Sequence, residues 1–332
     1  MTDAQAGGAA AIGPVVSVIV PTYNRGQFIA DAVQSVLSQS FTDFEVIVVD
    51  DGSSDNTAEV MRGFDDARVI YLRQANKGRS NARNHALSRA RGRYIAFLDS
   101  DDLYMPGKLA MQVDYLDTHP GTGMVYTSAH CIDYSGNPLG ENYLASVSGW
   151  IYSSIAFFRP VTITLPTVMA KRELFEKTGG FDENMHRFED TDMWRRISKL
   201  ARIDAMPDFT CRLRTHAENS LAAQDPAQIV GALDYYVRKI LAEDTAVATL
   251  VKRRGIGSLY YYYGRAFLTV PAWKEAGRRL LHTAYRYWFF LWFRQLAVTA
   301  YHWVSPDNVS LPPRSGAAAP ESRKKNEDRP SE

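Results

Sequence analysis

The fold is decided by the stretch YIAFLDSDD, residues 94–102. Its apolar run ends abruptly at Asp99, which is typical of a buried strand that passes into a loop. Asp101 and Asp102 follow directly, and hard divalent cations such as Mg²⁺ or Mn²⁺ prefer oxygen ligands of this kind. An Asp-rich turn that ends the strand and caps a helix begun by Pro106 explains the same residues. The stretch alone leaves both explanations open.

Three similar apolar runs precede it, at Val15–Val20, Phe44–Val49 and Arg68–Leu72. They alternate with stretches of helical periodicity, such as the apolar face that runs from Phe28 to Leu37. Alternating strands and helices predict an α/β fold with a mostly parallel sheet that helices cover on both faces.

Polar loops follow the strands of this predicted sheet. Ligands bind at the carboxyl ends of parallel strands, so Pro21–Asn24, Asp50–Ser53 and the aspartates after residue 98 are expected to meet at one edge. Asp50 and Asp51 repel each other unless another group satisfies them, and a bound nucleobase or ribose would do so. Residues 53–55 are also typical caps for the next helix. The two roles are compatible.

Residues 76–84, NKGRSNARN, lead into a helix. Backbone N–H groups and basic side chains gather at such a start, where a phosphate could bind, and Gly78 would permit a close approach. The ordinary alternative is a solvated basic surface formed by Arg83, Arg89, Arg91 and Arg93, which we favour for the last three.

The second half of this region is less regular. Residues 133–149 are rich in Gly, Asn and Ser and predict a loop that shapes or covers a site. A short strand is expected at Thr167–Ala170, a helix from Arg172, and a turn at Gly179–Glu183. The next helix opens with Glu189-Asp190-Thr191-Asp192. The helix dipole favours acidic residues there in any protein, but a carboxylate is also a suitable general base for a hydroxyl acceptor, and no His or Cys nucleophile arrangement competes.

Bulk composition excludes some classes of function. The 38 Lys+Arg and 37 Asp+Glu give no overall charge that would indicate a nucleic-acid partner. Two cysteines cannot form a disulfide framework, so a reducing compartment, the cytoplasm, is expected. Residues 1–14 lack the features of a secretory signal and predict a disordered lead-in, and residues 305–332 predict a disordered tail.

The C-terminal part, residues 226–304, is expected to be helical, with one helical hairpin at Gly264–Tyr285. From Lys252 to Trp303 there are nine Lys/Arg and one acidic residue, interleaved with aromatic residues. Such helices could rest on the anionic inner face of the cell membrane, although the region lacks a clean transmembrane span. The favoured alternative is a helical subdomain that buries its aromatic residues against the catalytic unit or against a second copy in a homodimer.

Six motifs, taken in order, resemble glycosyltransferase family 2. The similarity covers about Val15 to Ser220. The motifs are Pro21-Thr22-Tyr23-Asn24; Asp50-Asp51-Gly52-Ser53 with Asp55 and Thr57; Asn76-x-Gly78 with Ala82-Arg83-Asn84; Leu98-Asp99-Ser100-Asp101-Asp102; Gly179-Gly180-Phe181-Asp182; and Glu189-Asp190-x-Asp192-x-Trp194. The resemblance implies a GT-A fold over residues 15–222, with a nucleotide-binding half at 15–127 and an acceptor half at 128–222, followed by the C-terminal helical extension.

The resemblance also implies roles for particular residues. Asp101 is the expected metal ligand, with Asp99 beside it near the ribose, and the expected cofactor is Mn²⁺ or Mg²⁺. Asp190 is the expected base, supported by Glu189 and Asp192. His216 resembles a late family element that approaches the metal, although Leu213 stands where an aromatic residue is usual. The nucleotide-sugar site so implied comprises Pro21, Thr22, Tyr23, Asn24, Asp51, Asn76, Gly78, Arg83, Asp99 and Ser100.

These roles predict an inverting glycosyltransferase. Its donor would be a nucleoside-diphosphate sugar, a UDP-sugar above others, and its acceptor a hydroxyl of a saccharide or lipid-linked molecule. Two alternatives stay open: a nucleotidyltransferase acting on sugar phosphates, and a non-catalytic saccharide- or nucleotide-binding protein on the same fold. The first fits poorly, because residues 21–26 do not form the Gly-rich phosphate loop that it needs.

Overall fold

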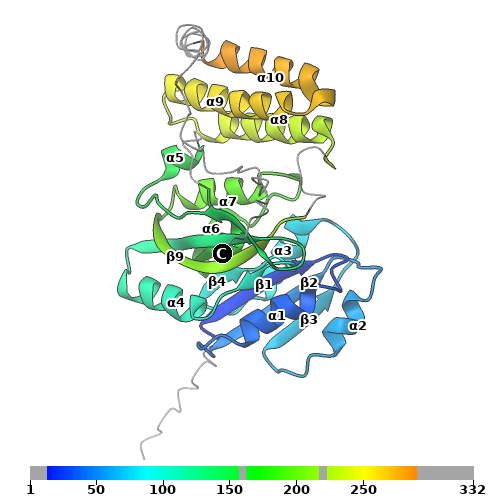
Figure 1. Cartoon of the computed structure of the whole chain (residues 1–332). Coiled ribbons are helices and arrows are strands. Elements are labelled where there is room, and N and C mark those ends of the chain that lie inside the picture. The colour runs from blue at the N-terminus through cyan, green and yellow to red at the C-terminus, as the bar shows by residue number, and fades with distance from the viewer. Residues whose placement is uncertain (1–12, 157–161, 217–222, 290–332) are drawn as a thin grey trace, which may run out of the picture.

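The computed structural model describes residues 13–156, 162–216 and 223–289 (Figure 1). A nine-stranded sheet lies between helices, and three further helices stack against one end of this unit. The predicted α/β architecture is therefore confirmed. The predicted lead-in falls almost wholly outside the described residues, as do residues 290–304 of the predicted helical region and the predicted tail.

Half of the sheet is parallel, as the alternating pattern predicts. Its strands lie in the order β3, β2, β1, β4, and each pairs in parallel with its neighbour. The helices between them cross from one strand to the next. These elements are β1 (Val16–Thr22), α1 (Ile29–Leu37), β2 (Phe44–Asp50), α2 (Thr57–Arg62), β3 (Val69–Arg73), α3 (Arg79–Arg89) and β4 (Tyr94–Phe97).

The other half of the sheet is mixed. From β4 the order continues β8, β6, β9, β5; β8 is antiparallel to both of its neighbours, whereas β6 and β9 are parallel. The elements are β5 (Leu103–Tyr104), α4 (Lys108–Thr118), β6 (Thr122–Ile132), β7 (Pro138–Tyr143), α5 (Tyr152–Ala156), the 3-10 turn Leu165–Thr167, β8 (Val168–Lys171), α6 (Arg172–Thr178), α7 (Glu189–Ile197) and β9 (Arg202–Arg214). The expected mostly parallel sheet thus describes the first half better than the second.

The predicted loop at 133–149 is wrong in part, because β7 lies within it. This strand pairs with the end of β6 beyond the point where β8 stops. All six of its residues are exposed, so it shows none of the apolar alternation that marks a half-buried strand.

Both faces of the sheet are covered, and successive strand residues alternate between the two cores. Ile19 lies in the core on the side of α3, α6 and α7. Val18 and Val20 lie in the other core, on the side of α1 and α4. The carboxyl ends of β1, β2 and β4 consequently stay at one edge, where their loops are free to form a site.

The C-terminal helices form a core of their own. They are α8 (Pro226–Glu243), α9 (Thr249–Leu268), the 3-10 turn Pro271–Trp273 and α10 (Lys274–Tyr287). Tyr260, Phe267 and Trp273 are buried among them. The favoured alternative expects aromatic burial against the catalytic unit or a second copy, whereas these three residues pack among the C-terminal helices. α9 and α10 pack together as the expected hairpin.

Glycines lie at the contact between α9 and α10. A Cβ on Gly264 would come within 2.9 Å of Leu281, and one on Gly277 within 3.0 Å of the Gly264 carbonyl oxygen. A Cβ on Gly257 would lie 2.6 Å from that of Trp288. Only glycine permits this approach, because it has no Cβ. We call Gly257, Gly264 and Gly277 the glycine contact.

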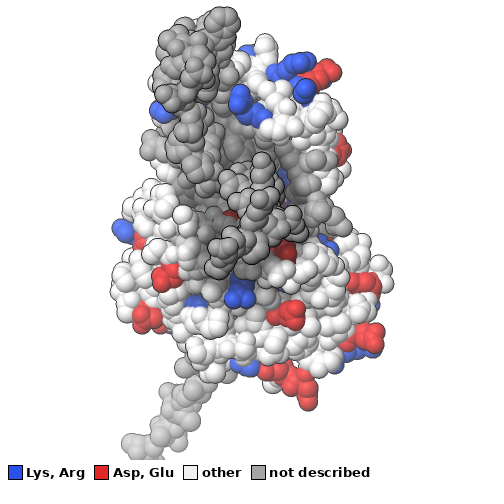
Figure 2. Space-filling model, viewed as in Figure 1, with Lys and Arg blue, Asp and Glu red and all other residues white. Residues whose placement is uncertain are grey.

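Acidic and basic side chains are interspersed over the sheet-bearing part of the face in Figure 2, and Lys and Arg gather at the helical end. None of the helices in the described part of the chain is long and apolar enough to cross a membrane.

Candidate active site

Two cavities meet at the edge of the sheet where β1, β2 and β4 end. The small cleft, about 330 Å³, is lined by Pro21, Thr22, Tyr23, Arg25, Asp51, Arg79, Ala82, Arg83, Asp99, Ser100 and Asp101. The large cavity, about 750 Å³, lies between α7 and α9 and contains Asp190. Arg79, Arg83 and Asp99 line both cavities. The two spaces are therefore neighbours with a shared polar boundary.

The small cleft contains buried polar atoms that lack a partner. The Thr22 hydroxyl and the Arg83 Nε have no hydrogen bond among the described residues, although both side chains are almost fully buried. Buried polar groups are nearly always satisfied, so such atoms call for an explanation. A polar ligand in the cleft would provide one for both.

Asp50 and Asp51 do not need a ligand to relieve their repulsion. The Asp50 carboxylate accepts hydrogen bonds from the Ser53 N–H and the Tyr71 hydroxyl. Asp51 accepts from the Gln74 side chain at 2.8 Å and from backbone N–H groups. The expectation that an external group must satisfy this pair is wrong, yet Asp51 still lines the small cleft.

The loop at 76–78 serves Asp51. The N–H groups of Lys77 and Gly78 donate to its carboxylate at 2.9 and 2.7 Å, and the positive φ of Gly78, 89°, aims the second of them. These amides are therefore already used and do not await a phosphate. Neither Asn76 nor Gly78 is among the residues that line the two cavities.

Asn24 is likewise structural in its contacts. Its side-chain oxygen accepts from the Ser54 N–H at 2.8 Å, and its own N–H donates to Ser53. It ties the loop after β1 to the loop after β2, while Asp55 caps the N–H of Thr57 as expected. Tyr23 of the same loop is exposed and lines the small cleft.

Arg83 is buried at the boundary between the cavities, which contradicts a solvated position. Its guanidinium contacts Asp99 at 3.1 Å and Glu189 at 3.0 Å. Arg79, one turn earlier on α3, contacts Glu189 at 3.1 Å. Arg91 and Arg93 lie at the surface, as expected. The ion pairs of Arg83 with Asp99 and Glu189 thus join the loop after β4 to the start of α7.

Asp101 and His216 meet beside the small cleft. The His216 Nε2 lies 2.8 Å from an Asp101 carboxylate oxygen, and the Arg25 guanidinium lies 3.4 Å from the same oxygen. The described residues contain no group of three or more metal-ligating side chains. The Asp101 carboxylate is the type of oxygen ligand that Mg²⁺ takes while it keeps waters and binds substrate phosphates. The His216 nitrogen is not an oxygen ligand of that kind.

Asp102 holds the loop after β4 in place instead of capping a helix. Its carboxylate accepts from the Arg214 N–H at 2.7 Å. Burial raises the pKa of this carboxyl well above its usual range, and Asp99 adds to the effect. The start of α4 is capped at Gly107 without a side-chain hydrogen bond, so the cap predicted for these aspartates is absent there.

Asp190 lies in the first turn of α7 and faces the large cavity. Its carboxylate accepts from the N–H of its neighbour Thr191 at 2.6 Å. Burial raises its pKa to about 6, and the adjacent Glu189 adds to the rise, while Arg83 opposes it. The group is thus a carboxylate at neutral pH that still binds a proton readily, as a general base requires.

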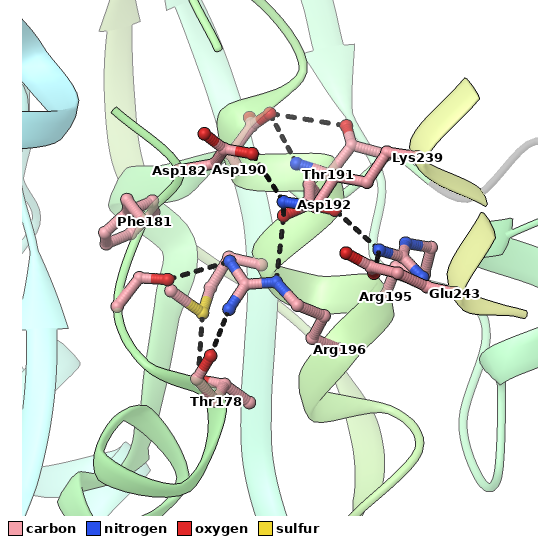
Figure 3. A network of polar contacts seen from close by, with 12 residues as sticks. Thr178, Phe181, Asp182, Asp190, Thr191, Asp192, Arg195, Arg196, Lys239 and Glu243 are labelled. Carbon is pink, nitrogen blue, oxygen red and sulfur yellow. Dashed lines mark hydrogen bonds and ion pairs between the residues drawn. The ribbon is translucent and has the colours of Figure 1, made fainter. Parts of the chain in front are cut away.

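Asp192 has partners other than those of Asp190, and Figure 3 shows both carboxylates. It is fully buried and pairs with Arg195 at 2.7 Å, with Arg196 at 2.8 Å and with Lys239 of α8 at 3.0 Å. Arg195 continues to Asp244 at 2.9 Å. Asp192 lines neither cavity, so its contacts fasten α7 to α8 and do not support its expected place beside the base.

Several lining residues were missed by sequence reasoning. Arg25 is an ordinary basic residue in the sequence, and only its contact with Asp101 distinguishes it. Arg79 belongs to the basic stretch 76–84, but its contact with Glu189 was not expected. Tyr262 and Tyr263 on α9 also line the large cavity. They lie some 70 residues beyond α7 in the chain, and no local pattern assigns them to it.

Comparison with solved structures identifies the class of protein that has this fold. The protein TarS of S. aureus, solved as residues 1–349 in complex with UDP-GlcNAc, superposes with a TM-score of 0.61 at 22% identity, covering 81% of this chain and 79% of the TarS chain. A mannosyltransferase from Pyrobaculum calidifontis, solved with GDP-Man and Mn²⁺, superposes with a TM-score of 0.56 at 22% identity, covering 89% and 82%. The fold is that of the GT-A glycosyltransferases.

Sequence comparison gives the family. Residues 17–177 match the family described as Glycosyl transferase family 2. A putative teichuronic acid biosynthesis glycosyltransferase, TuaG of Bacillus subtilis, is 36% identical over 56% of this chain and 73% of its own length. The chain belongs to glycosyltransferase family 2.

The chain spans only about a third of the length of other relatives that it matches. An uncharacterized glycosyltransferase of Rickettsia bellii is 34% identical over 62% of this chain but only 29% of its own length. The similarity thus covers only a part of such relatives, so it does not extend to the activity of a whole protein.

Proposed function

We propose that the chain transfers a sugar from a nucleoside-diphosphate sugar to a hydroxyl of a saccharide or lipid-linked acceptor, with inversion at the anomeric carbon. The observation that carries this proposal is the pair of neighbouring cavities that share Arg79, Arg83 and Asp99. The donor nucleotide would occupy the small cleft and the acceptor the large cavity. The family relationship favours this function over nucleotidyl transfer.

The donor side rests on the loops after the strands. Asp51 and Thr22 would contact the base and ribose, and Tyr23 would lie against the base. The unpartnered Thr22 hydroxyl supports this assignment. The solved relatives have UDP-GlcNAc or GDP-Man in their complexes, and we propose a UDP-sugar for this chain.

Asp190 would remove the proton from the acceptor hydroxyl as its oxygen attacks the anomeric carbon. The bond between that carbon and the diphosphate oxygen breaks in the same step, so one displacement inverts the configuration. Arg83 and Arg79 lie at the boundary where the diphosphate would leave, and their positive charge would stabilise it. General-base assistance of this kind contributes roughly 10²–10⁴-fold.

Asp101 and His216, with Asp99 nearby, would hold Mn²⁺ or Mg²⁺. Such an ion, when bound, would neutralise charge on the departing diphosphate. Arg25 already contacts Asp101, and it would have to share that oxygen with the cation.

The test is a screen of UDP- and GDP-sugars by thermal shift and by release of free nucleoside diphosphate, with Mn²⁺ present or chelated. A donor at 100 times its dissociation constant should stabilise the protein by about 2.7 kcal/mol. Metal-dependent release of the diphosphate would support the proposal. A donor that binds and is never cleaved, with any acceptor offered, would instead favour the non-catalytic alternative.

We propose that the basic end formed by α9 and α10 places the protein at the inner, cytoplasmic face of the cell membrane. An acceptor anchored in that membrane would then be within reach. Arg253, Arg254, Arg278 and Arg279 are exposed there. We propose contact with anionic lipid at this surface, worth about 1 kcal/mol for each basic residue near the headgroups. Co-sedimentation with vesicles of phosphatidylglycerol, but not phosphatidylcholine, at low salt is the expected result. Equal recovery with the two types of vesicle would refute the proposed lipid contact.

Sedimentation velocity tests the predicted homodimer.

A further inference from the structure

One wall of the large cavity comes from outside the family-like region. Ser258, Leu259, Tyr262 and Tyr263 of α9 face the same space as Asp190. The family match ends at residue 177, so this wall belongs to the C-terminal extension. The extension thus completes a cavity that the sheet-bearing unit leaves open on that side.

The wall is aromatic and continuous. Tyr262 and Tyr263 meet edge to face with ring centroids 5.3 Å apart. Tyr263 meets Phe188 edge to face at 5.7 Å. Phe188 immediately precedes α7 and in turn stacks on Tyr236 of α8. We call Tyr262, Tyr263 and Phe188 the aromatic strip; it leads from the open side of the cavity to the first turn of α7.

The strip contains groups that the fold itself does not use. Tyr262 is 67% exposed, although it is a large ring on a packed helix. Neither its hydroxyl nor that of Tyr263 makes a hydrogen bond to a described residue. Burial raises the pKa of the Tyr263 phenol to about 12, and the charges of Tyr262 and Asp190 add smaller contributions.

The backbone beside the strip is constrained as well. Phe188 has a φ of 65°, in the left-handed region that a bulky residue seldom adopts. Strained positions of this type concentrate at functional sites, where the surrounding structure holds them. Here the stacking on Tyr236 and the contact with Tyr263 supply that support.

We propose that the aromatic strip is the acceptor subsite and binds a sugar ring by stacking, with Tyr262 as its principal contact. A pyranose presents C–H groups on its faces and hydroxyls at its rim, and a wall of rings bordered by Thr164, Ser258 and Asp190 matches both. This inference rests on the proposed function and deepens it, because it names a saccharide as the acceptor class and assigns its recognition to the C-terminal extension.

The test measures transfer to methyl and octyl glycosides of glucose, galactose and N-acetylglucosamine, with the donor that the screen selects. Tyr262→Ala should raise the acceptor KM about tenfold, the loss expected for one stacking contact, and Tyr262→Phe should restore most of it. Tyr263→Phe keeps the ring and removes the hydroxyl, so it separates stacking from hydrogen bonding. Comparing methyl with octyl glycosides distinguishes recognition of the sugar from recognition of an attached chain.

The matched control is Leu250→Ala, because Leu250 is also on α9, is 66% exposed and is not among the residues that line either cavity. It should leave transfer unchanged. An acceptor KM that does not move in Tyr262→Ala, in a protein with an unchanged melting temperature, would overturn the inference. Failure of the proposed function looks different: the wild-type protein would then release no nucleoside diphosphate from any donor, with or without glycoside.

Discussion

The first turn of α7 carries two aspartates, Asp190 and Asp192, whose surroundings shift their pKa values in opposite directions. Asp190 faces the large cavity, accepts from the adjacent Thr191 N–H, and has its pKa raised to about 6 by burial and by Glu189. Two residues on, Asp192 is also buried, which alone would raise its pKa, yet Arg196 and its other cationic partners hold that pKa below the ordinary value.

The difference teaches what each carboxylate can do. Surrounding cations stabilise the ionised form of a carboxylate and lower its pKa. Such a carboxylate stabilises the structure but is a weak base. A buried carboxylate with few partners binds a proton more readily and makes a better base. On the proposed function, the first turn of α7 carries the general base and an anchoring carboxylate two residues apart, and the following changes test this proposal.

The largest effect is expected for Asp190→Asn. The amide cannot accept the proton, so turnover should fall by roughly 10²–10⁴-fold, while the dissociation constant of the donor nucleotide stays the same. Steady-state kinetics and calorimetric titration with the nucleoside diphosphate measure the two quantities. Asp114→Asn, on the exposed side of α4, is the control. Turnover that survives Asp190→Asn would remove that residue from the role of base.

Arg195→Met should act on stability instead. Arg195 is fully buried between Asp192 and Asp244, and removal of a buried partner leaves uncompensated charge that costs roughly 3–5 kcal/mol. Chemical denaturation measures this loss.

The control for that change is Arg279→Met, which breaks an exposed pair with Glu275 at 2.5 Å. Such surface pairs contribute less than about 0.5 kcal/mol. Equal losses of stability in the two variants would mean that the buried network does not anchor α7.

Asp101→Ala extends the comparison to the loop after β4, where the carboxylate is shared between His216 and Arg25. We expect the Mn²⁺ concentration for half-maximal donor binding to rise at least about tenfold, since loss of even a supporting residue weakens metal sites by that factor. Titration with Mn²⁺ at fixed nucleotide checks this. An unchanged midpoint would argue against a cation on Asp101.

The smallest effect is a change in pH dependence. Because the base must be unprotonated, and burial with Glu189 raises the pKa of Asp190 to about 6, kcat/KM should fall as pH drops through about 6. Glu189→Gln removes a neighbouring negative charge, so the acid limb should move to lower pH. A limb that stays in place, or moves upward, would show that another group controls it.

Much of the fold was predictable because its first strands are short, mainly apolar runs rich in Val and Ile. β9 was not, since Pro207 and Asp208 interrupt it and its register against β6 shifts there. β7 was hidden because it is wholly exposed. In each case the strand is specified by its neighbours across the sheet and carries little signal of its own.

The candidate site divides in the same way. Asp51, Asp99 and Asp101 follow strands, so their meeting at one edge could be foreseen from strand order. Glu189 and Asp192 are alike in sequence, and only the cations around each one reveal that the first faces the cavity and the second fastens a helix. The wall formed by α9 depends on packing between distant segments, which local pattern does not encode.

The glycine contact between α9 and α10 allows exposed side chains of α9 to change while the packing of the helix stays the same. At Gly257 and Gly264, α9 lies directly against Trp288 and Leu281, whereas Tyr262 of the same helix lines the large cavity. Exchanges at Tyr262 leave the glycine contact untouched. If Tyr262 contacts the acceptor as proposed, a side chain there can be exchanged without rebuilding the scaffold that carries it.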